Sequence, residues 1–144
     1  GKLKEKTGAH LALHKDDFFL WDKLEDQCRI FGLPYEPAPP PDIWLEHEEE
    51  IDIKNNFGKA LHTPGHTPGS MCFLFDSQKL LIAGDTLFHG SIGRTDLWGG
   101  DYRKIEHSIQ SILYTLDEST NVITGHGAPT TIGHEMRSNN FIRA

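Results

Sequence analysis

The stretch HTPGHTPGS, residues 62–70, combines two histidines with two prolines and two glycines, and the apolar run MCFLF follows it directly at residues 71–75. The apolar run is short and uninterrupted, which predicts a buried strand. Proline fixes the local backbone and glycine lets it approach other groups closely, so such a loop can hold an imidazole ring at a set angle. The stretch therefore predicts a loop that carries histidines at the end of a strand.

Two more polar residues stand at the ends of short apolar runs. Asp85 follows the run at residues 80–83 after one glycine, and His126 follows the run at residues 122–124 after another. Because ligands gather at strand ends in layered α/β folds, we expect His66, Asp85 and His126 to lie together. They are separated by 19 and 41 residues, a spacing typical of a metal site built from loops and unlike that of a zinc finger. The residues alone leave a metal site and three ordinary turn residues as equal alternatives.

The rest of the chain has the pattern of an α/β fold. Apolar residues spaced three and four apart predict one helix over residues 18–31 and another over residues 101–116. Short apolar segments between these helices, separated by turn residues, predict a run of antiparallel strands. A strand over residues 122–124 and a short helix over residues 132–139 are expected to follow. This order predicts layers of helix and sheet.

Length and charge narrow the possible functions. The 144 residues allow one domain and little more, and 14 Lys and Arg against 21 Asp and Glu leave a net charge of −7. So acidic a chain is a poor binder of nucleic acid or anionic membranes, and no apolar run is long enough to span a bilayer. Cys28 and Cys72 are too few for a disulfide scaffold, and we interpret them as buried thiols of a protein in the reducing cytoplasm.

Taken together, these segments resemble the metallo-β-lactamase superfamily, and most closely its glyoxalase II-like branch, the hydroxyacylglutathione hydrolases and their short bacterial relatives. The resemblance runs from about residue 9 to the last residue and rests on residues 62–70, 81–88, 90–96, 125–127, 130–135 and 140–141. It implies an αββα sandwich made of two similar halves, of which this chain matches mainly the C-terminal half.

The resemblance also implies a centre of two divalent metal ions, with zinc as the usual metal and iron or manganese as alternatives. In that centre His66 would bind the first ion and His126 the second. Asp85 would bridge the two ions and is the catalytic carboxylate that the resemblance assigns to this chain. We expect metal affinity to fall at acidic pH, because histidine must be neutral to coordinate.

The other ligands of this family belong to a His-x-His-x-Asp-His motif, and no His-x-His occurs in the 144 residues. We therefore interpret residues 1–144 as a single incomplete domain that lacks the N-terminal strands and this motif. Three ligands cannot hold two metal ions against water, so we expect the chain by itself to be inactive. The resemblance places His62 outside the ligand set, and gives Arg94 and Asp96 the role of tying loops together.

The activity implied for the complete protein is that of a metal-dependent hydrolase. A hydroxide held between the ions would attack a thioester such as S-lactoylglutathione. Two alternatives stay open: an iron enzyme similar to persulfide dioxygenases, which share the segment at residues 93–96, and a half-domain without catalysis that binds another chain. Whichever of these functions applies, we expect a second chain or the N-terminal half to cover a sheet face that includes apolar residues from 71–75.

The remaining histidines are interpreted mainly as structural. His89 is close to Asp85 in sequence and is the one that could reach the mouth of a pocket. For His134 a supporting role is favoured over that of a ligand. The other four, His10, His14, His47 and His107, have no partner pattern that indicates a site.

Overall fold

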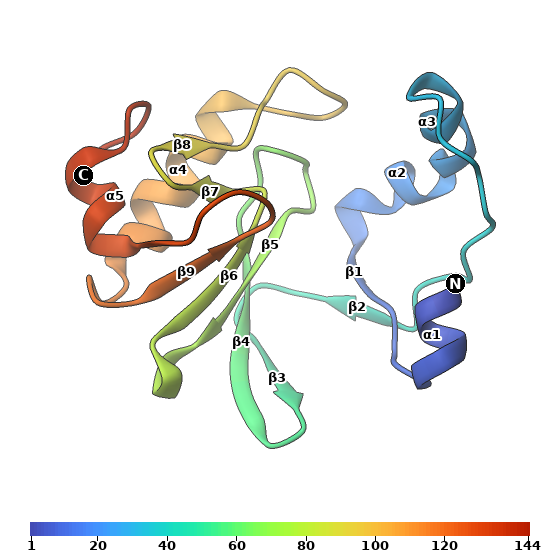
Figure 1. Cartoon of the computed structure of the whole chain (residues 1–144), viewed down its shortest axis with the longest axis horizontal. Coiled ribbons are helices and arrows are strands. Elements are labelled where there is room, and N and C mark those ends of the chain that lie inside the picture. Colours follow the sequence, from blue (N-terminus) through green and yellow to red (C-terminus); the bar gives the residue numbers. More distant parts are fainter. The chain divides into compact units, whose positions relative to one another are not determined.

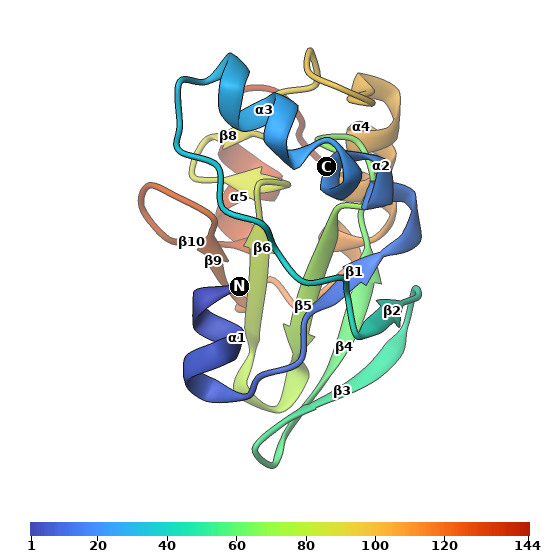
Figure 2. The ribbon, with the colours of Figure 1, turned by 90° about the vertical axis from the view of Figure 1, so that its right-hand side faces the viewer.

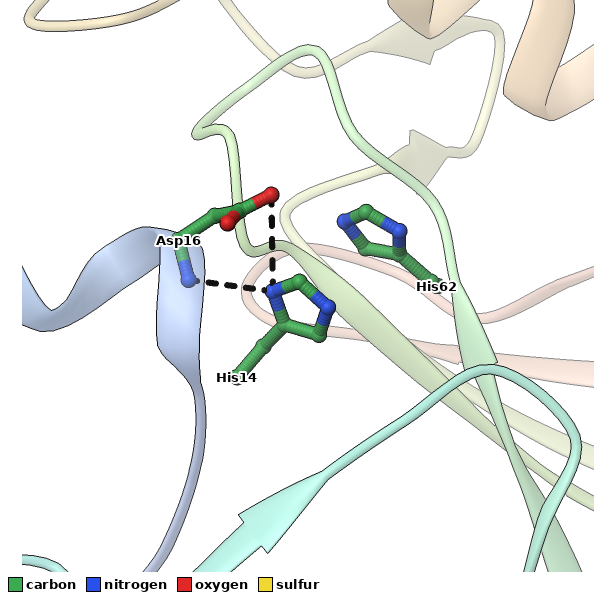
Figure 3. Close-up of side chains that lie close together, drawn as sticks. All are labelled: His14, Asp16 and His62. Atoms are coloured by element: carbon green, nitrogen blue, oxygen red, sulfur yellow. Dashed lines mark hydrogen bonds and ion pairs between the residues drawn. The ribbon is translucent and has the colours of Figure 1, made fainter.

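The computed structural model describes all residues from 1 to 144 and divides them into two units, residues 1–45 and residues 46–144 (Figure 1). The first unit contains α1 (Lys2–Thr7), β1 (Ala12–His14), η1 (Lys15–Asp17), α2 (Phe18–Asp22), α3 (Leu24–Ile30) and β2 (Ile43–Leu45). Strands β1 and β2 pair in parallel. The backbone N–H of Asp16 donates to Nδ1 of His14, 3.2 Å away, so that the imidazole caps η1 (Figure 3).

The single helix predicted over residues 18–31 is wrong, because the structure has two short helices that meet at Lys23. Lys23 has φ −100° and ψ 18°, outside the helical region. The side-chain amide of Gln27 donates to the carbonyl of Leu20 at 2.5 Å and so satisfies a group that a continuous helix would bond internally. The apolar face expected here is only half-buried, since Phe18 is 44 % and Phe31 55 % exposed.

The second unit is built on one sheet of six strands in the order β10-β9-β6-β5-β4-β3. Its strands are β3 (Glu49–Ile53), β4 (Asn56–His62), β5 (Met71–Phe75), β6 (Leu80–Gly84), β9 (Asn121–Thr124) and β10 (Thr130–Thr131). All neighbours are antiparallel except β6 and β9, which are parallel. Figure 2 shows β6, β5, β4 and β3 side by side. The smaller elements are η2 (Asp76–Gln78), the hairpin β7 (Leu87–Phe88) and β8 (Ser91–Ile92), α4 (Tyr102–Ser111), η3 (Leu113–Thr115) and α5 (Ile132–Ser138).

The core of this unit lies between one face of the sheet and the helices α4 and α5, which Figure 1 shows on the same side. Leu81 and Val122 are paired neighbours in the sheet, and both are fully buried together with Ile105 and Ile109 of α4. Helix α4 begins as predicted, because the Asp101 carboxylate accepts from the backbone N–H groups of residues 103 and 104. The α/β class predicted from the sequence is therefore confirmed.

The other face of the same sheet carries a second apolar row. Ala60, Phe73, Ile82 and Ile123 are aligned across β4, β5, β6 and β9, and we call them the open row. Ile82 is 37 % and Ile123 47 % exposed. The exposed apolar face was expected to include side chains of residues 71–75, but the most exposed members of the row are Ile82 of β6 and Ile123 of β9.

The structure also tests the expected burial of the two cysteines and the expected lack of a membrane-spanning segment. Cys72 is buried, as predicted, whereas Cys28 is only half-buried, because the helix that carries it leaves much of its apolar face exposed. The longest helix, α4, has ten residues, and none of the helices combines the length and the apolar character required to cross a bilayer.

Candidate metal centre

His66 lies in the loop between β4 and β5, and this loop is fixed by its own hydrogen bonds. The N–H of Thr63 donates to the Ser70 carbonyl at 2.8 Å, and the N–H of Thr67 donates to the Ser70 hydroxyl at 3.0 Å. Gly65 has φ +142°, and a Cβ at this position would lie 2.3 Å from Ile105 of α4. Only glycine therefore allows the loop to pack this closely on the helix.

The His66 ring is oriented by a backbone carbonyl. Its Nδ1 lies 2.8 Å from the carbonyl oxygen of Arg94. A carbonyl can only accept, so Nδ1 carries the proton and Nε2 keeps its lone pair. This is the arrangement in which histidine ligands are usually held, with the second ring nitrogen bonded to the protein.

Asp85 follows β6 at an irregularity of the sheet, where the register of β6 against β9 shifts between Ile82 and Gly84. Two glycines from other loops pack closely on this residue, Gly93 on its backbone carbonyl and Gly125 on its carboxylate. A Cβ at Gly93 would lie 1.8 Å from the Asp85 carbonyl oxygen, and one at Gly125 would lie 2.1 Å from Asp85 Oδ1. Asp85 Oδ2 lies 3.7 Å from His66 Nε2, the nitrogen that keeps its lone pair.

His126 enters the same pocket from the loop after β9. Its ring packs against Phe88 with the ring centroids 4.4 Å apart and the planes tilted by 32°. His66, Asp85 and His126 line one pocket of about 380 Å³. They do not form a single cluster with all donor atoms within 4.8 Å of one another. The structure therefore brings His66 and Asp85 within 3.7 Å of each other and places His126 in the lining of the same pocket.

A buried polar network behind the pocket was not predicted. The Thr63 hydroxyl lies 3.2 Å from the Thr86 hydroxyl and 3.2 Å from Cys72 Sγ. It joins the loop that bears His66 to the turn that follows Asp85. Burial raises the pKa of the Cys72 thiol to about 11, so the thiol stays protonated and inert at neutral pH. The sequence signal was the two threonines adjacent to the histidine and aspartate loops.

Three further residues named from the sequence lie at the edge of this arrangement. His62 Nε2 bonds to the Pro68 carbonyl at 2.8 Å, within its own loop. The Arg94 guanidinium makes two hydrogen bonds of 2.7 Å to the Asp96 carboxylate, which lowers the pKa of Asp96 to about 2. This pair braces one loop and does not join two, so it is the Arg94 backbone carbonyl, bonded to His66, that ties loops together.

The donors gathered here fit a divalent metal of the zinc or iron type. Two imidazoles and a carboxylate are the ligand types that these ions prefer, and the imidazole of His66 already has the required tautomer. Gly125 leaves space for the Asp85 carboxylate, and Gly93 leaves space for the Asp85 backbone carbonyl. His66 and Asp85 are therefore held in a fixed orientation, the first by the Arg94 carbonyl and the second by close packing with neighbouring loops.

Comparison with known proteins gives a consistent family. Residues 1–126 match the model of the Metallo-beta-lactamase superfamily. The chain is 41 % identical to the hydroxyacylglutathione hydrolase GloC of Haemophilus influenzae, covering 99 % of this chain and 68 % of that protein. It is 42 % identical to the probable metallo-hydrolase YqgX of Bacillus subtilis, covering 98 % and 67 % of the two chains.

Solved structures give the same result. The BLEG-1 B3 metallo-beta-lactamase has a TM-score of 0.89 at 36 % identity, with 99 % of this chain and 69 % of that chain covered. TTHA1623 in a di-iron-bound form has a TM-score of 0.89 at 34 % identity, with 98 % and 69 % covered. ETHE1 from Myxococcus xanthus has a TM-score of 0.75 at 26 % identity, with 96 % and 54 % covered.

Proposed function

Because the chain belongs to the metallo-β-lactamase superfamily of metal-dependent hydrolases, we propose that it supplies part of a glyoxalase II-type centre that hydrolyses a thioester such as S-lactoylglutathione. The observation that carries this proposal is the approach of His66 Nε2 to Asp85 Oδ2 at 3.7 Å, in a pocket that also contains His126. The similarity to GloC supports this thioester class.

The residues of this chain act mainly by holding ligands in position. His66 is fixed by the Arg94 carbonyl, and Asp85 is enclosed by glycines 93 and 125. His66 and His126 would each bind one divalent ion, and Asp85 would bridge the two. When bound there, two divalent ions supply a hydroxide near neutral pH and a Lewis acid for the carbonyl oxygen. No Ser or Cys nucleophile is required.

Zinc is the metal that we propose, with iron and manganese as alternatives. The similarity to TTHA1623 in its di-iron-bound form supports iron as the first alternative. The pocket of about 380 Å³ lies within the size range of small-molecule sites, which is about 300–1,000 Å³. We also place the activity in the cytoplasm, because Cys28 and Cys72 are both free thiols.

The test is turnover of S-lactoylglutathione by the complete protein supplied with zinc, in which residues 1–144 are joined to the N-terminal half that carries the remaining ligands, because residues 1–144 alone are expected to be inactive. We expect Asp85→Asn and His126→Gln to reduce kcat/KM by at least about 100-fold, since each removes a ligand. Asp117→Asn is the matched control, because Asp117 is an exposed aspartate bonded to Lys79 and Ser119. Turnover that survives Asp85→Asn at the level of this control would refute the proposal.

A second candidate is a persulfide dioxygenase-like iron enzyme. The similarity to ETHE1 from Myxococcus xanthus favours it, together with the Gly-Arg-Thr-Asp segment at residues 93–96. Oxygen consumption with glutathione persulfide, measured on the iron-loaded protein, separates the two activities. Consumption without thioester turnover would establish the second candidate over the first.

We further propose that the open row binds another polypeptide segment, either a second chain or the N-terminal half of the sandwich. Ile82 and Ile123 lie side by side on β6 and β9 and are both exposed. Because only 37 % and 47 % of these side chains remain exposed, covering them contributes about 0.5–1.5 kcal/mol each. A chain whose role is only this binding, without catalysis, is the third candidate, and thioester turnover by the complete protein, with its N-terminal half, distinguishes it.

A further inference from the structure

A second group of metal-binding side chains lies at the edge of the pocket and shares no residue with the proposed centre. His89, His134 and Glu135 each offer a donor atom, and the three atoms all lie within 4.8 Å of one another. His89 is in the two-residue turn between β7 and β8, and the other two residues are in α5. We propose that they form a separate site for one divalent transition-metal ion such as Zn²⁺. This inference does not depend on the proposed function.

The carboxylate of Glu135 is the first reason. Its side chain is completely buried. Three groups donate to it: the backbone N–H of Gly90 at 2.9 Å, the side-chain amide of Asn139 at 2.7 Å, and the hydroxyl of Thr130. Donors therefore reach both oxygens of this buried carboxylate and fix its position.

Glu135 has no lysine or arginine as an ion-pair partner. No lysine or arginine nitrogen lies within 4.0 Å of Glu135, and the one basic group at this distance is Nε2 of His134, 3.8 Å from Oε1. A metal ion placed between these groups would be coordinated by the buried carboxylate and by the two imidazoles beside it, which are common zinc ligands.

The geometry of the imidazoles is the second reason. His89 Nδ1 lies 3.4 Å from the Pro129 carbonyl, which can only accept. Nδ1 therefore carries the proton and Nε2 keeps the lone pair, as in histidine ligands held by a backbone carbonyl. The rings of His89 and His134 lie with centroids 4.9 Å apart, a distance at which two positively charged rings would repel each other.

The distances lie close to those of a bound ion. Donor atoms bound tetrahedrally to zinc at about 2.1 Å are about 3.4 Å apart, against 3.8 Å between His134 Nε2 and Glu135 Oε1. His89 and His134 are exposed, so small rotations of their side chains can close the remaining gap. The buried Glu135 would stay fixed by its three donors.

The ligand types indicate which ion would bind. Two imidazoles and one carboxylate, with the fourth position left to water, form a common zinc ligand set. Such nitrogen-rich sites favour zinc, nickel, cobalt or copper over magnesium and calcium, which prefer oxygen ligands. Since His89 also lines the pocket of His66 and Asp85, the ion would lie beside the pocket that we assign to the substrate.

The test uses Co²⁺ as a spectroscopic probe and Zn²⁺ as its competitor. The full chain carrying His66→Gln, Asp85→Asn and His126→Gln has lost the proposed centre, and we expect it to bind one Co²⁺ with visible absorption that Zn²⁺ abolishes. Adding His89→Gln or His134→Gln should weaken binding at least tenfold. His107→Gln is the matched control, because His107 is an exposed histidine of α4 bonded only to Ser111, and it should change nothing.

Nuclear magnetic resonance of the unaltered chain gives a second readout that needs no variant. Adding Zn²⁺ should shift the ring signals of His89 and His134 together, and leave His107 unchanged. Absence of Co²⁺ binding in the triple variant, without a His89 or His134 shift in the unaltered chain, would overturn the proposal. Equal affinity in the His89, His134 and His107 variants would also overturn it.

Discussion

Gly125→Ala is the substitution that best tests how Asp85 is held. A Cβ at this position would lie 2.1 Å from Asp85 Oδ1 and 3.0 Å from the backbone carbon and oxygen of Gly84. Gly125 is not among the residues with positive φ, so alanine meets no left-handed backbone strain there, and its severest clash is the one with Asp85 Oδ1. The clash therefore falls on the carboxylate, which must move by more than about 1 Å to reach an ordinary contact of about 3.5 Å.

The expected effect is large on the site and moderate on the fold. A misplacement of about 1 Å at a reacting group can cost about 100-fold in rate, so we expect kcat/KM of the complete protein, with its N-terminal half, to fall by about that factor. Overpacking of this kind lowers the free energy of unfolding by about 1–3 kcal/mol. Metal affinity should fall by about 10- to 100-fold, as when groups that orient a ligand are changed.

Gly127→Ala is the matched control. Gly127 has φ +83° and nothing within 4 Å of its would-be Cβ. Alanine is strained there, at about 1–2 kcal/mol of stability, but it leaves the Asp85 carboxylate in place. The assays are urea unfolding, competition for zinc with a chromogenic chelator, and thioester turnover. Equal metal affinity and turnover in the two variants would refute the claim that Gly125 makes room for Asp85.

Three further predictions follow from single features of the second unit. The pKa of Cys72 is about 11 in the folded chain against 9.0 for an ordinary thiol, so its contribution to stability is complete below pH 9 and is lost as the pH rises to about 11. The loss is about 3 kcal/mol in urea unfolding, and an equal pH dependence in Cys72→Ala would contradict it. Gly65→Ala combines a positive φ with contact to Ile105 and should lower the free energy of unfolding by about 4 kcal/mol; a midpoint near that of the wild type would contradict this. The chain should sediment as an oligomer or with a bound peptide, and the double substitution Ile82→Asp with Ile123→Asp should abolish this association. A dilute, folded wild-type monomer without bound peptide would show that no other polypeptide covers the open row.

Much of the sheet could be predicted because its signals are local. The apolar runs around residues 71–75 and 80–83 identify strands without knowledge of their partners, and polar residues at their ends identify one edge of the sheet. The proximity of His66 and Asp85 follows from this edge. The start of the helix predicted from residue 101 is a local signal too, because the Asp101 carboxylate caps α4 through neighbours two and three residues away.

Other features depend on partners that are distant in sequence. The helix break at Lys23 involves neither Gly nor Pro, so no residue type marks it. The side-chain amide of Gln27 donates to the Leu20 carbonyl at the break, but a glutamine whose amide faces solvent looks the same in the sequence. The bond from His66 to the Arg94 carbonyl uses a backbone group, which leaves no mark on residue type.

The cluster of His89, His134 and Glu135 is the clearest case. Its members are separated by up to 46 residues, and Glu135 reads in sequence as one more exposed acid beside a histidine. Only the fold shows that Gly90 and Asn139 donate to a buried carboxylate.

The central claim is that His66, Asp85 and His126 form a metal centre, and anomalous X-ray diffraction at the zinc edge tests it most directly. Crystals of the complete protein, with the N-terminal half that carries the remaining ligands, grown with zinc should show an anomalous peak about 2.0–2.2 Å from His66 Nε2 and from an Asp85 carboxylate oxygen, and a second ion at His126. Anomalous peaks that contact none of these three residues, or their absence from the pocket at saturating zinc, would contradict the account.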